Sequence, residues 1–281
     1  RLSLILGPKE QTPTPFLEKQ PEQSDKLHPL LDFSIANLGL APRHILISDE
    51  TFFFIDPNAN TAYQFQQRNS TVLIGLPKNQ NWLAATLVKT EKGNLIVLLN
   101  QSQNFYQYNP SSQKASPLPL ILPYKNAIIK AMADYQGNLY LLDLQNNQII
   151  KCANLENCQP WLKEKSDLSQ AISLAIDGSI YVLKSDGSIT EYLSGYKKED
   201  FEFKAPFSSQ TSAGQILTKS GFKNLYLLDP SGKQIIILDK TGQLIKQYQN
   251  PDFSDLTGLA ISSDEKNIFV LNGLKLYQLN Q

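Results

Sequence analysis

Apolar residues occur along this chain in short runs separated by polar turns, and no stretch keeps the 3.6-residue period of a long helix. The segment GNLYLLDLQNNQIIKC, residues 137–152, is typical. Two apolar runs flank a polar turn, which predicts a β-hairpin. Because a single hairpin is barely stable in water, the rest of its sheet must come from elsewhere in the sequence.

The same hairpin recurs at a steady interval along the chain. When the first apolar residues of successive copies are aligned, they lie 43, 44, 41, 45 and 43 residues apart. These aligned residues are Phe52, Leu95, Leu139, Ile180, Leu225 and Ile268. A repeat of this length that is built from strands is typical of a β-propeller blade.

Each period contains one further short strand before the hairpin and, in most units, another after it, which gives four antiparallel strands. The middle strand is apolar on both faces: in NLYLLD, Leu139 and Leu141 point one way, and Tyr140 and Leu142 point the other. Such a sheet must be stacked between two neighbours. A sandwich would not repeat six times, and a solenoid would leave both end faces exposed. We therefore predict an all-β, six-bladed β-propeller of four-stranded antiparallel blades.

The predicted propeller spans residues 43–281, and its sixth unit stops after the third strand. The predicted units are 43–78, 79–122, 123–165, 166–207, 208–252 and 253–281. The missing outer strand must come from the N-terminal region, 1–42, if the ring is to close without an open edge. The two candidates are LSLIL at 2–6 and TPFLEK at 14–19, and the polar segment 8–28 is expected to form a linker or an arm lying on the domain.

Composition limits the partners. The 281 residues include 26 Lys and Arg against 26 Asp and Glu, and only three of the cations are Arg, so we expect no nucleic-acid partner. No apolar run approaches the roughly 20 residues that span a bilayer. The chain starts at Arg1 and its single Met is Met132, so we expect a piece of a longer protein. Whether a membrane anchor precedes it is left open.

The two cysteines, Cys152 and Cys158, flank a five-residue turn between the third and fourth strands of one unit. Neighbouring antiparallel strands would place the thiols opposite each other, within reach of a disulfide. Two free thiols are the alternative. A zinc site would need two further ligands. A disulfide would indicate an oxidising compartment, and we expect an extracytoplasmic location on this basis.

The repeats resemble the NHL family of propellers, whose units centre on a pattern like G-x-I/L-Y-V-x-D followed by x-x-N-x-R-I. In residues 137–150 the glycine, the Leu-Tyr pair, Asp143, Asn146 and Ile149 match, while Gln148 stands in place of the family's arginine. The unit at 223–239 matches at Asp229 and Ile235 but has Gly232 and Gln234 at the Asn and Arg positions, and the other four units are weaker. The resemblance covers about 43–281.

The resemblance implies a propeller and a context, since NHL-like propellers occur as extracytoplasmic domains of bacterial membrane-anchored signalling proteins, including receptor-type kinases. It does not imply an activity, because propellers carry many unrelated functions. The family aspartate falls at Asp56, Asp143 and Asp229, where the turn after the second strand begins. Its carboxylate is expected to accept backbone N–H groups there.

No local motif assigns a catalytic residue, a metal ligand or a cofactor. His28 and His44 lie outside any catalytic pattern, and NST at 69–71 is only a formal glycosylation triplet. A lactonase-like hydrolase or lyase is the alternative function, because such propellers bind a metal through Glu, Asn and Asp from different blades and so leave no local spacing to detect.

Aromatic residues in the loops between units are the candidate binding residues: Trp82, Tyr124, Phe207 and Phe253. Rigid aromatic side chains at one mouth of the channel suit peptide, protein or glycan recognition. The alternative is that they plug the channel or cover blade edges. We therefore expect a non-catalytic recognition or sensor domain, the extracytoplasmic part of a larger membrane-anchored signalling protein.

Overall fold

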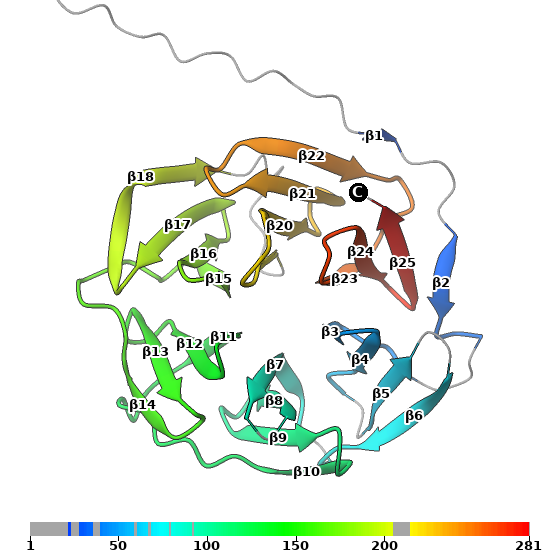
Figure 1. Ribbon diagram of the computed structural model, residues 1–281, viewed down its shortest axis with the longest axis horizontal. Helices are drawn as coiled ribbons and strands as arrows, with labels where there is room; N and C mark the ends of the chain where they lie inside the picture. Colours follow the sequence, from blue (N-terminus) through cyan, green and yellow to red (C-terminus); the bar gives the residue numbers. More distant parts are fainter. Residues whose placement is uncertain are drawn as a thin grey trace, which may run out of the picture.

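The computed structural model describes residues 22–23, 28–35, 40–58, 61–66, 69–78, 80–91, 93–204 and 214–280. These residues form twenty-five strands and no helix, arranged as six antiparallel sheets around a central axis (Figure 1). The predicted six-bladed propeller is therefore confirmed. In each blade the first strand lies next to the axis, and in blades 1 to 4 the strands follow one another outward in chain order.

The blades are built from consecutive strands. Blade 1 contains β3 (His44–Ser48), β4 (Thr51–Ile55), β5 (Thr61–Gln66) and β6 (Asn69–Gly75). Blade 2 contains β7 (Trp82–Thr90), β8 (Gly93–Asn100), β9 (Phe105–Asn109) and β10 (Lys114–Pro117). Blade 3 contains β11 (Ile129–Tyr135), β12 (Asn138–Asp143), β13 (Gln148–Ala153) and β14 (Asn157–Pro160). Blade 4 contains β15 (Ala171–Ile176), β16 (Ile180–Lys184), β17 (Ser188–Leu193) and β18 (Tyr196–Lys204).

The last two blades include strands from the N-terminal region. Blade 5 contains β19 (Gln215–Leu217), β20 (Asn224–Asp229), β21 (Gln234–Asp239) and β22 (Leu244–Gln249), with β1 (Glu22–Gln23) parallel to β22 on its outer edge. Blade 6 contains β23 (Leu256–Ile261), β24 (Asn267–Asn272) and β25 (Lys275–Asn280), and its outer strand is β2 (Pro29–Asp32).

An N-terminal strand closes the ring, as the sequence predicts, but the choice of segment was wrong. Pro29–Asp32 pairs antiparallel with β25, where Leu31 lies opposite Leu276 and Asp32 opposite Lys275. The favoured segments 2–6 and 14–19 lie outside the described residues. The donor was missed because it is only four residues long and adjoins the polar arm. Its proline is at the first position of an edge strand, where the missing N–H costs no ladder bond.

The core is a ring of six apolar clusters, one at each blade interface. In β12, Leu139 and Leu141 are fully buried toward blade 2, and Tyr140 and Leu142 are buried toward blade 4. The alternation predicted from NLYLLD is thus present. Each fully buried Leu contributes about 1.5–3 kcal/mol to folding, so the stacking of blades is the main stabilising interaction.

A buried polar side chain ends or follows the second strand in five of the six blades. We refer to this as the anchor position; its residues in blades 1 to 6 are Asp56, Asn100, Asp143, Lys184, Asp229 and Asn272. Asp143, which is 0% exposed, accepts hydrogen bonds from the backbone N–H groups of Ile128, Gln145 and Asn146 at 3.0–3.3 Å. The predicted role of the aspartate in the turn is confirmed, and the bond to Ile128 also fixes the connection that enters the blade.

Cys152 and Cys158 lie opposite each other on β13 and β14 and form a disulfide, which confirms the predicted bridge. Both cysteines of the chain are therefore oxidised. Such a bond suggests an extracytoplasmic location, because stable disulfides persist mainly in oxidising compartments. In the part of the chain that the structure describes, no helix could cross a membrane.

Candidate functional site

A cavity of about 590 Å³ lies on the propeller axis, and the first strands of all six blades line it. These strands, β3, β7, β11, β15, β19 and β23, surround the central opening seen in Figure 1. They begin where the connections between blades arrive and end in the tight turns before the second strands. We call the end of the cavity near the connections between blades the loop mouth, and the end near the tight turns the turn mouth.

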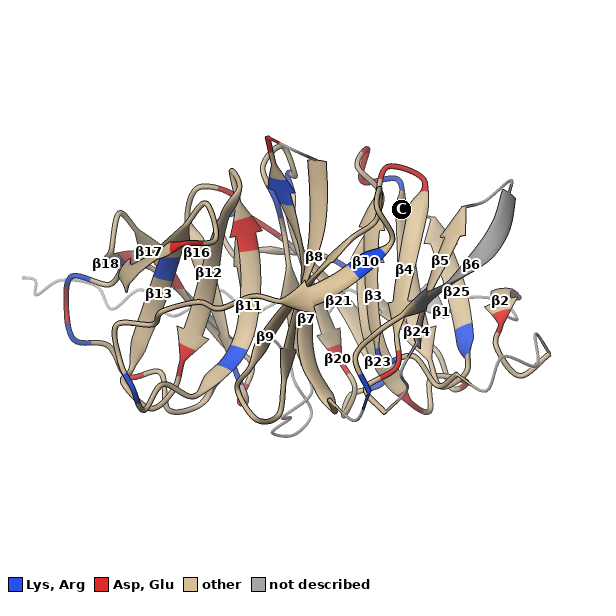
Figure 2. Cartoon of the chain, turned by 90° about the horizontal axis from the view of Figure 1, so that it is seen from below, with Lys and Arg blue, Asp and Glu red and all other residues tan. Residues whose placement is uncertain are grey.

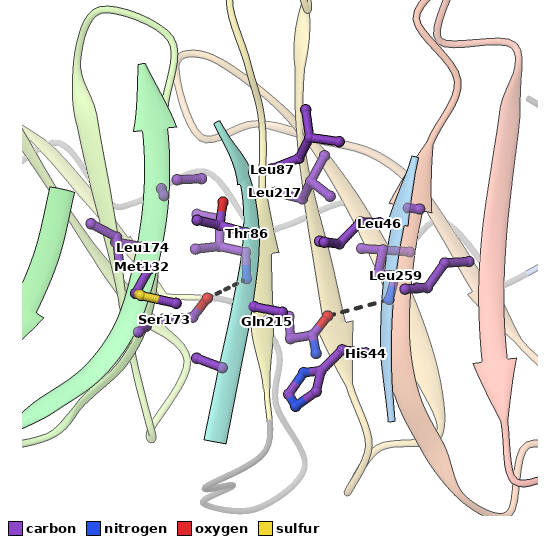
Figure 3. A pocket seen from close by; sticks show the side chains of 18 of the residues that line it. His44, Leu46, Thr86, Leu87, Met132, Ser173, Leu174, Gln215, Leu217 and Leu259 are labelled. Atoms are coloured by element: carbon purple, nitrogen blue, oxygen red, sulfur yellow. Dashed lines mark hydrogen bonds between the residues drawn. The ribbon is translucent and has the colours of Figure 1, made fainter. Parts of the chain in front are cut away.

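Large apolar side chains form a ring inside this cavity. Each blade contributes one residue, and we call the set the apolar ring: Leu46, Leu87, Met132, Leu174, Leu217 and Leu259 (Figure 3). They are 41, 45, 42, 43 and 42 residues apart, which is close to the blade period, but they do not share one register position. Met132, Leu174 and Leu259 lie opposite second-strand residues that face the preceding blade, whereas Leu46 and Leu217 lie opposite residues that face the following blade. Leu174 and Leu259 are only 4% and 3% exposed, whereas Leu46, Leu87 and Leu217 are half-buried. The ring therefore joins the blade interfaces and also presents apolar surface to the cavity.

Cationic and neutral polar residues line the loop mouth. Its lining includes Arg43, His44, Lys130, Gln215 and Thr257. Arg43 pairs with Asp255 at 3.4 Å, and both of these side chains are about half exposed, so the pair is weak. Lys130 is half-buried and forms no ion pair among the described residues. This mouth can therefore present positive charge to a ligand.

His44 begins β3 and is half-buried against the cavity. Burial lowers the pKa of this imidazole; a hydrogen bond with the backbone of Trp82 acts in the opposite direction, and the charge of Arg43 lowers the pKa further. The ring is therefore neutral at pH 7 and can either donate or accept a hydrogen bond.

Two other polar residues in the cavity are committed to holding blades together. Ser173 Oγ accepts a hydrogen bond from the backbone N–H of Ile216 at 3.2 Å, which links blade 4 to blade 5 (Figure 3). Gln215 accepts one from the N–H of Leu259 at 3.2 Å and donates one to the carbonyl of Thr257 at 3.1 Å, which links blade 5 to blade 6. The main role of Ser173 and Gln215 is therefore to link neighbouring blades.

The turn mouth is electrostatically mixed. Lys89, Asp134 and Lys219 all line it. Burial raises the pKa of Asp134 to about 6, although backbone hydrogen bonds at Lys89 and Gly137 and the charge of Lys89 oppose the shift. One carboxylate oxygen of Asp134 has no hydrogen-bond partner within the described ranges. Lys219 lies over the ring of Phe222 at 4.7 Å, and burial together with the charge of Lys89 lowers its pKa.

The predicted aromatic residues do not come together on one surface. Trp82 is 2% exposed, borders the cavity and packs edge-on against Tyr106, while Phe253 is 1% exposed in the core between blades 5 and 6. Tyr124 is half-buried against the core between blades 2 and 3. Phe207 lies outside the described residues. Direct contact with a ligand stays a prediction for these residues.

Several site residues were not identified from the sequence. The apolar ring was visible there in principle, because its members repeat with the period of the blades, in the strand before each hairpin. The presence of both Lys130 and His44 in the cavity lining had no sequence signal, since the two residues lie in blades 3 and 1. His28 is exposed in the N-terminal region, away from the cavity lining.

Metal-ligand chemistry is sparse in the described ranges. No group of three or more His, Cys, Asp or Glu side chains there is arranged to hold a metal ion. Among the described residues that line the cavity, Asp134 is the single carboxylate and no asparagine occurs. The lining therefore lacks the combination of Glu, Asn and Asp that the enzyme alternative requires.

Comparison with known proteins identifies the fold but no family. No protein-family model matches the sequence, and a search of curated proteins finds no match. The structure is similar to a catalytically inactive virginiamycin B lyase from Staphylococcus aureus with quinupristin (15% identity, TM-score 0.64, 91% of this chain and 99% of that chain).

A gluconolactonase from Xanthomonas campestris is similar to the same degree (13% identity, TM-score 0.62, 92% and 96%). The WD40 propeller domain of Doa1 also matches (7% identity, TM-score 0.55, 85% and 92%). At these identities the likeness shows a propeller fold alone, shared by enzymes and binding domains.

Proposed function

We propose that this chain is a non-catalytic recognition propeller that binds a peptide, a protein or a glycan at the loop mouth of its cavity. The open cavity on the axis is the observation that supports this most strongly, because it combines an apolar ring with a polar rim. Binding sites of this size are commonly apolar inside, with a few polar groups that orient the ligand.

The setting we propose is extracytoplasmic, as the exported part of a larger membrane-anchored signalling protein. The Cys152–Cys158 disulfide supports the compartment. The similarity of the repeats to NHL propellers supports the signalling context. Charges of both signs occur along the side of the disc seen in Figure 2, which favours a protein or glycan partner over nucleic acid.

A metal-dependent hydrolase or lyase is the alternative function. The structural similarity to a lyase and a gluconolactonase is the observation in its favour. Its weakness is the lining, in which Asp134 is the single carboxylate among the described residues. Elemental analysis of the native protein, with lactone hydrolysis assayed on the same sample, tests this alternative. One bound divalent ion together with hydrolysis would replace our proposal.

The recognition function can be tested by saturation-transfer NMR with a mixed library of short peptides and oligosaccharides. The matched variant is Leu87→Trp/Leu217→Trp, which fills the cavity at two half-buried ring positions. We expect compounds that bind the wild-type protein to lose their signal with this variant. Equal binding to both proteins, once circular dichroism shows that the variant is folded, would contradict a ligand site in the cavity.

A further inference from the structure

We infer that the cavity takes an amphiphilic anion, with an apolar group inside the apolar ring and a negatively charged group at Lys130 in the loop mouth. This inference rests on the proposed function and adds the class of ligand. The apolar ring offers surface to the cavity from six blades, and no charged side chain belongs to it. Moving an apolar group from water into such a site is favourable.

The charges of the loop mouth favour an anion. Arg43 and Lys130 line it, and no carboxylate does so among the described residues. Asp255 compensates part of the charge of Arg43, but their 3.4 Å contact is half exposed and leaves the guanidinium open to another partner. Burial lowers the pKa of His44, so this imidazole adds no positive charge, and Arg43 and Lys130 are the cations of this mouth.

The backbone positions Lys130 for this role. The pairing of β11 with β12 shifts register between Ile129 and Ala131, so Lys130 is the extra residue of a β-bulge, and blades 2, 4 and 6 have the same shift in their first strands. A bulge redirects the side chain of its extra residue and is common beside functional sites. Lys130 also has no carboxylate partner of its own within the described ranges, unlike Arg43. A half-buried ammonium of this kind gains most from an anionic ligand, because its surroundings screen charge less than water does.

The turn mouth carries charges of both signs. Lys89 and Lys219 line it together with Asp134, so two ammonium groups offset the one carboxylate there. The loop mouth has no carboxylate among its described lining residues, and we place the anionic group at Lys130 for this reason. An amphiphilic cation would find no matching carboxylate at the loop mouth.

A matched pair of fluorescent probes tests this inference: 8-anilinonaphthalene-1-sulfonate and the uncharged N-phenyl-1-naphthylamine, which has the same rings without the sulfonate. We expect the sulfonate to bind the wild-type protein with one saturable site and more tightly than the neutral probe. In Lys130→Gln the affinity for the sulfonate should fall about five- to tenfold, as expected for loss of a part-buried charge interaction. The affinity for the neutral probe should not change.

The controls separate charge from position. Lys114→Gln removes an exposed lysine on the outer strand β10, away from the cavity lining, and should bind both probes like the wild type. Leu87→Gln makes the apolar ring more polar and should weaken both probes. Leu217→Gln serves in its place if thermal denaturation shows that Leu87→Gln is unfolded.

The outcomes distinguish this inference from the proposed function. If both probes bind equally and Leu87→Gln weakens both, the cavity is a ligand site but the preference for an anion is wrong. If neither probe is affected by the ring variant, the cavity is not their site and both proposals fail. If the sulfonate loses affinity in Lys130→Gln alone among the lysine variants, the inference is supported.

The same assay can identify the source of the anion. Decanoate and a short peptide that ends in leucine with a free carboxylate are each tested for displacement of the sulfonate probe, beside the amidated form of the peptide. Displacement by decanoate alone indicates a lipid-like carboxylate, and displacement by the free but not the amidated peptide indicates a peptide C-terminus. Displacement by the amidated peptide as strongly as by the free one would overturn the assignment of the anion to Lys130.

Discussion

The residues at the anchor position and those two residues before the members of the apolar ring both recur once in each blade, but they differ in how much they vary. The anchor position is Asp or Asn in five of the six blades. The second position, which we call the variable position, differs in every blade: His44, Ala85, Lys130, Ile172, Gln215 and Thr257. Both sets of residues lie on or beside the first two strands of the six blades.

The difference separates what the fold requires from what it leaves open. The five Asp and Asn side chains at the anchor position accept hydrogen bonds from backbone N–H groups that would otherwise lack these partners, so few residue types fit. The variable position lines the cavity, and its demands differ between blades: Gln215 bonds to blade 6, whereas Lys130 forms no ion pair among the described residues. A repeat protein can place its ligand chemistry at such positions without loss of stability, and the following predictions test that division.

The largest effect is expected at the anchor position of blade 3. Asp143→Ala would leave three backbone N–H groups and the amide of Asn146 without their acceptor, which should lower the free energy of unfolding by about 3 kcal/mol or more. Urea denaturation measures this change. Lys184→Ala, at the anchor position of blade 4, is the matched control and should cost less than about 1 kcal/mol. Equal costs would show that the anchor carboxylate has no special role.

A smaller effect is expected from the disulfide. The double variant Cys152→Ala/Cys158→Ala removes a bridge that closes a loop with a sequence separation of 6. So short a loop restrains the unfolded chain little, and the loss should be at most about 2 kcal/mol. Comparison of wild-type and variant denaturation curves with and without dithiothreitol provides the measurement. Destabilisation of the variant by the reductant would contradict the assignment of its effect to this bond.

Asp134 should make stability depend on pH. Burial raises the pKa of Asp134 to about 6, so the folded protein binds this proton more tightly than the unfolded chain. The contribution is fully present below about pH 4 and is lost as the pH rises through about 6. Asp134→Asn should therefore be more stable than the wild type at pH 7, by about 1 kcal/mol after allowance for partial exposure, and equal to it at pH 4. A constant difference across this range would assign the effect to packing.

The smallest effect on stability is expected at the variable position. Lys130→Gln should change the free energy of unfolding by less than about 0.5 kcal/mol, because Lys130 has no ion pair to lose among the described residues. Thermal denaturation beside Asp143→Ala measures the contrast directly. A loss of stability comparable to that of the anchor variant would remove the distinction between the two positions.

The sequence alone predicted those features that repeat or are local. The hairpin period located the blades, the alternation in NLYLLD predicted burial on both faces, and the turn aspartates and the disulfide followed from residues close together in the chain. The closing strand was misplaced because Pro29–Asp32 carries only a short apolar signal beside a polar arm. The chemistry of the cavity could not be predicted, because Lys130 and His44 lie in different blades and line the same cavity only in the folded ring.

Ring closure by β2 also sets an order of events for folding. The strand Pro29–Asp32 is synthesised before any blade, yet its partner β25 is the last of the described strands to appear. β2 stays unpaired while the intervening blades form. Among the described strand pairings, that of β2 with β25 has the largest sequence separation and therefore the highest loop-closure entropy cost. A ribosome-bound chain that lacks the last blade would expose both an unpaired strand and an open blade edge. Protection of that edge until synthesis ends is a task for chaperones or for rapid export.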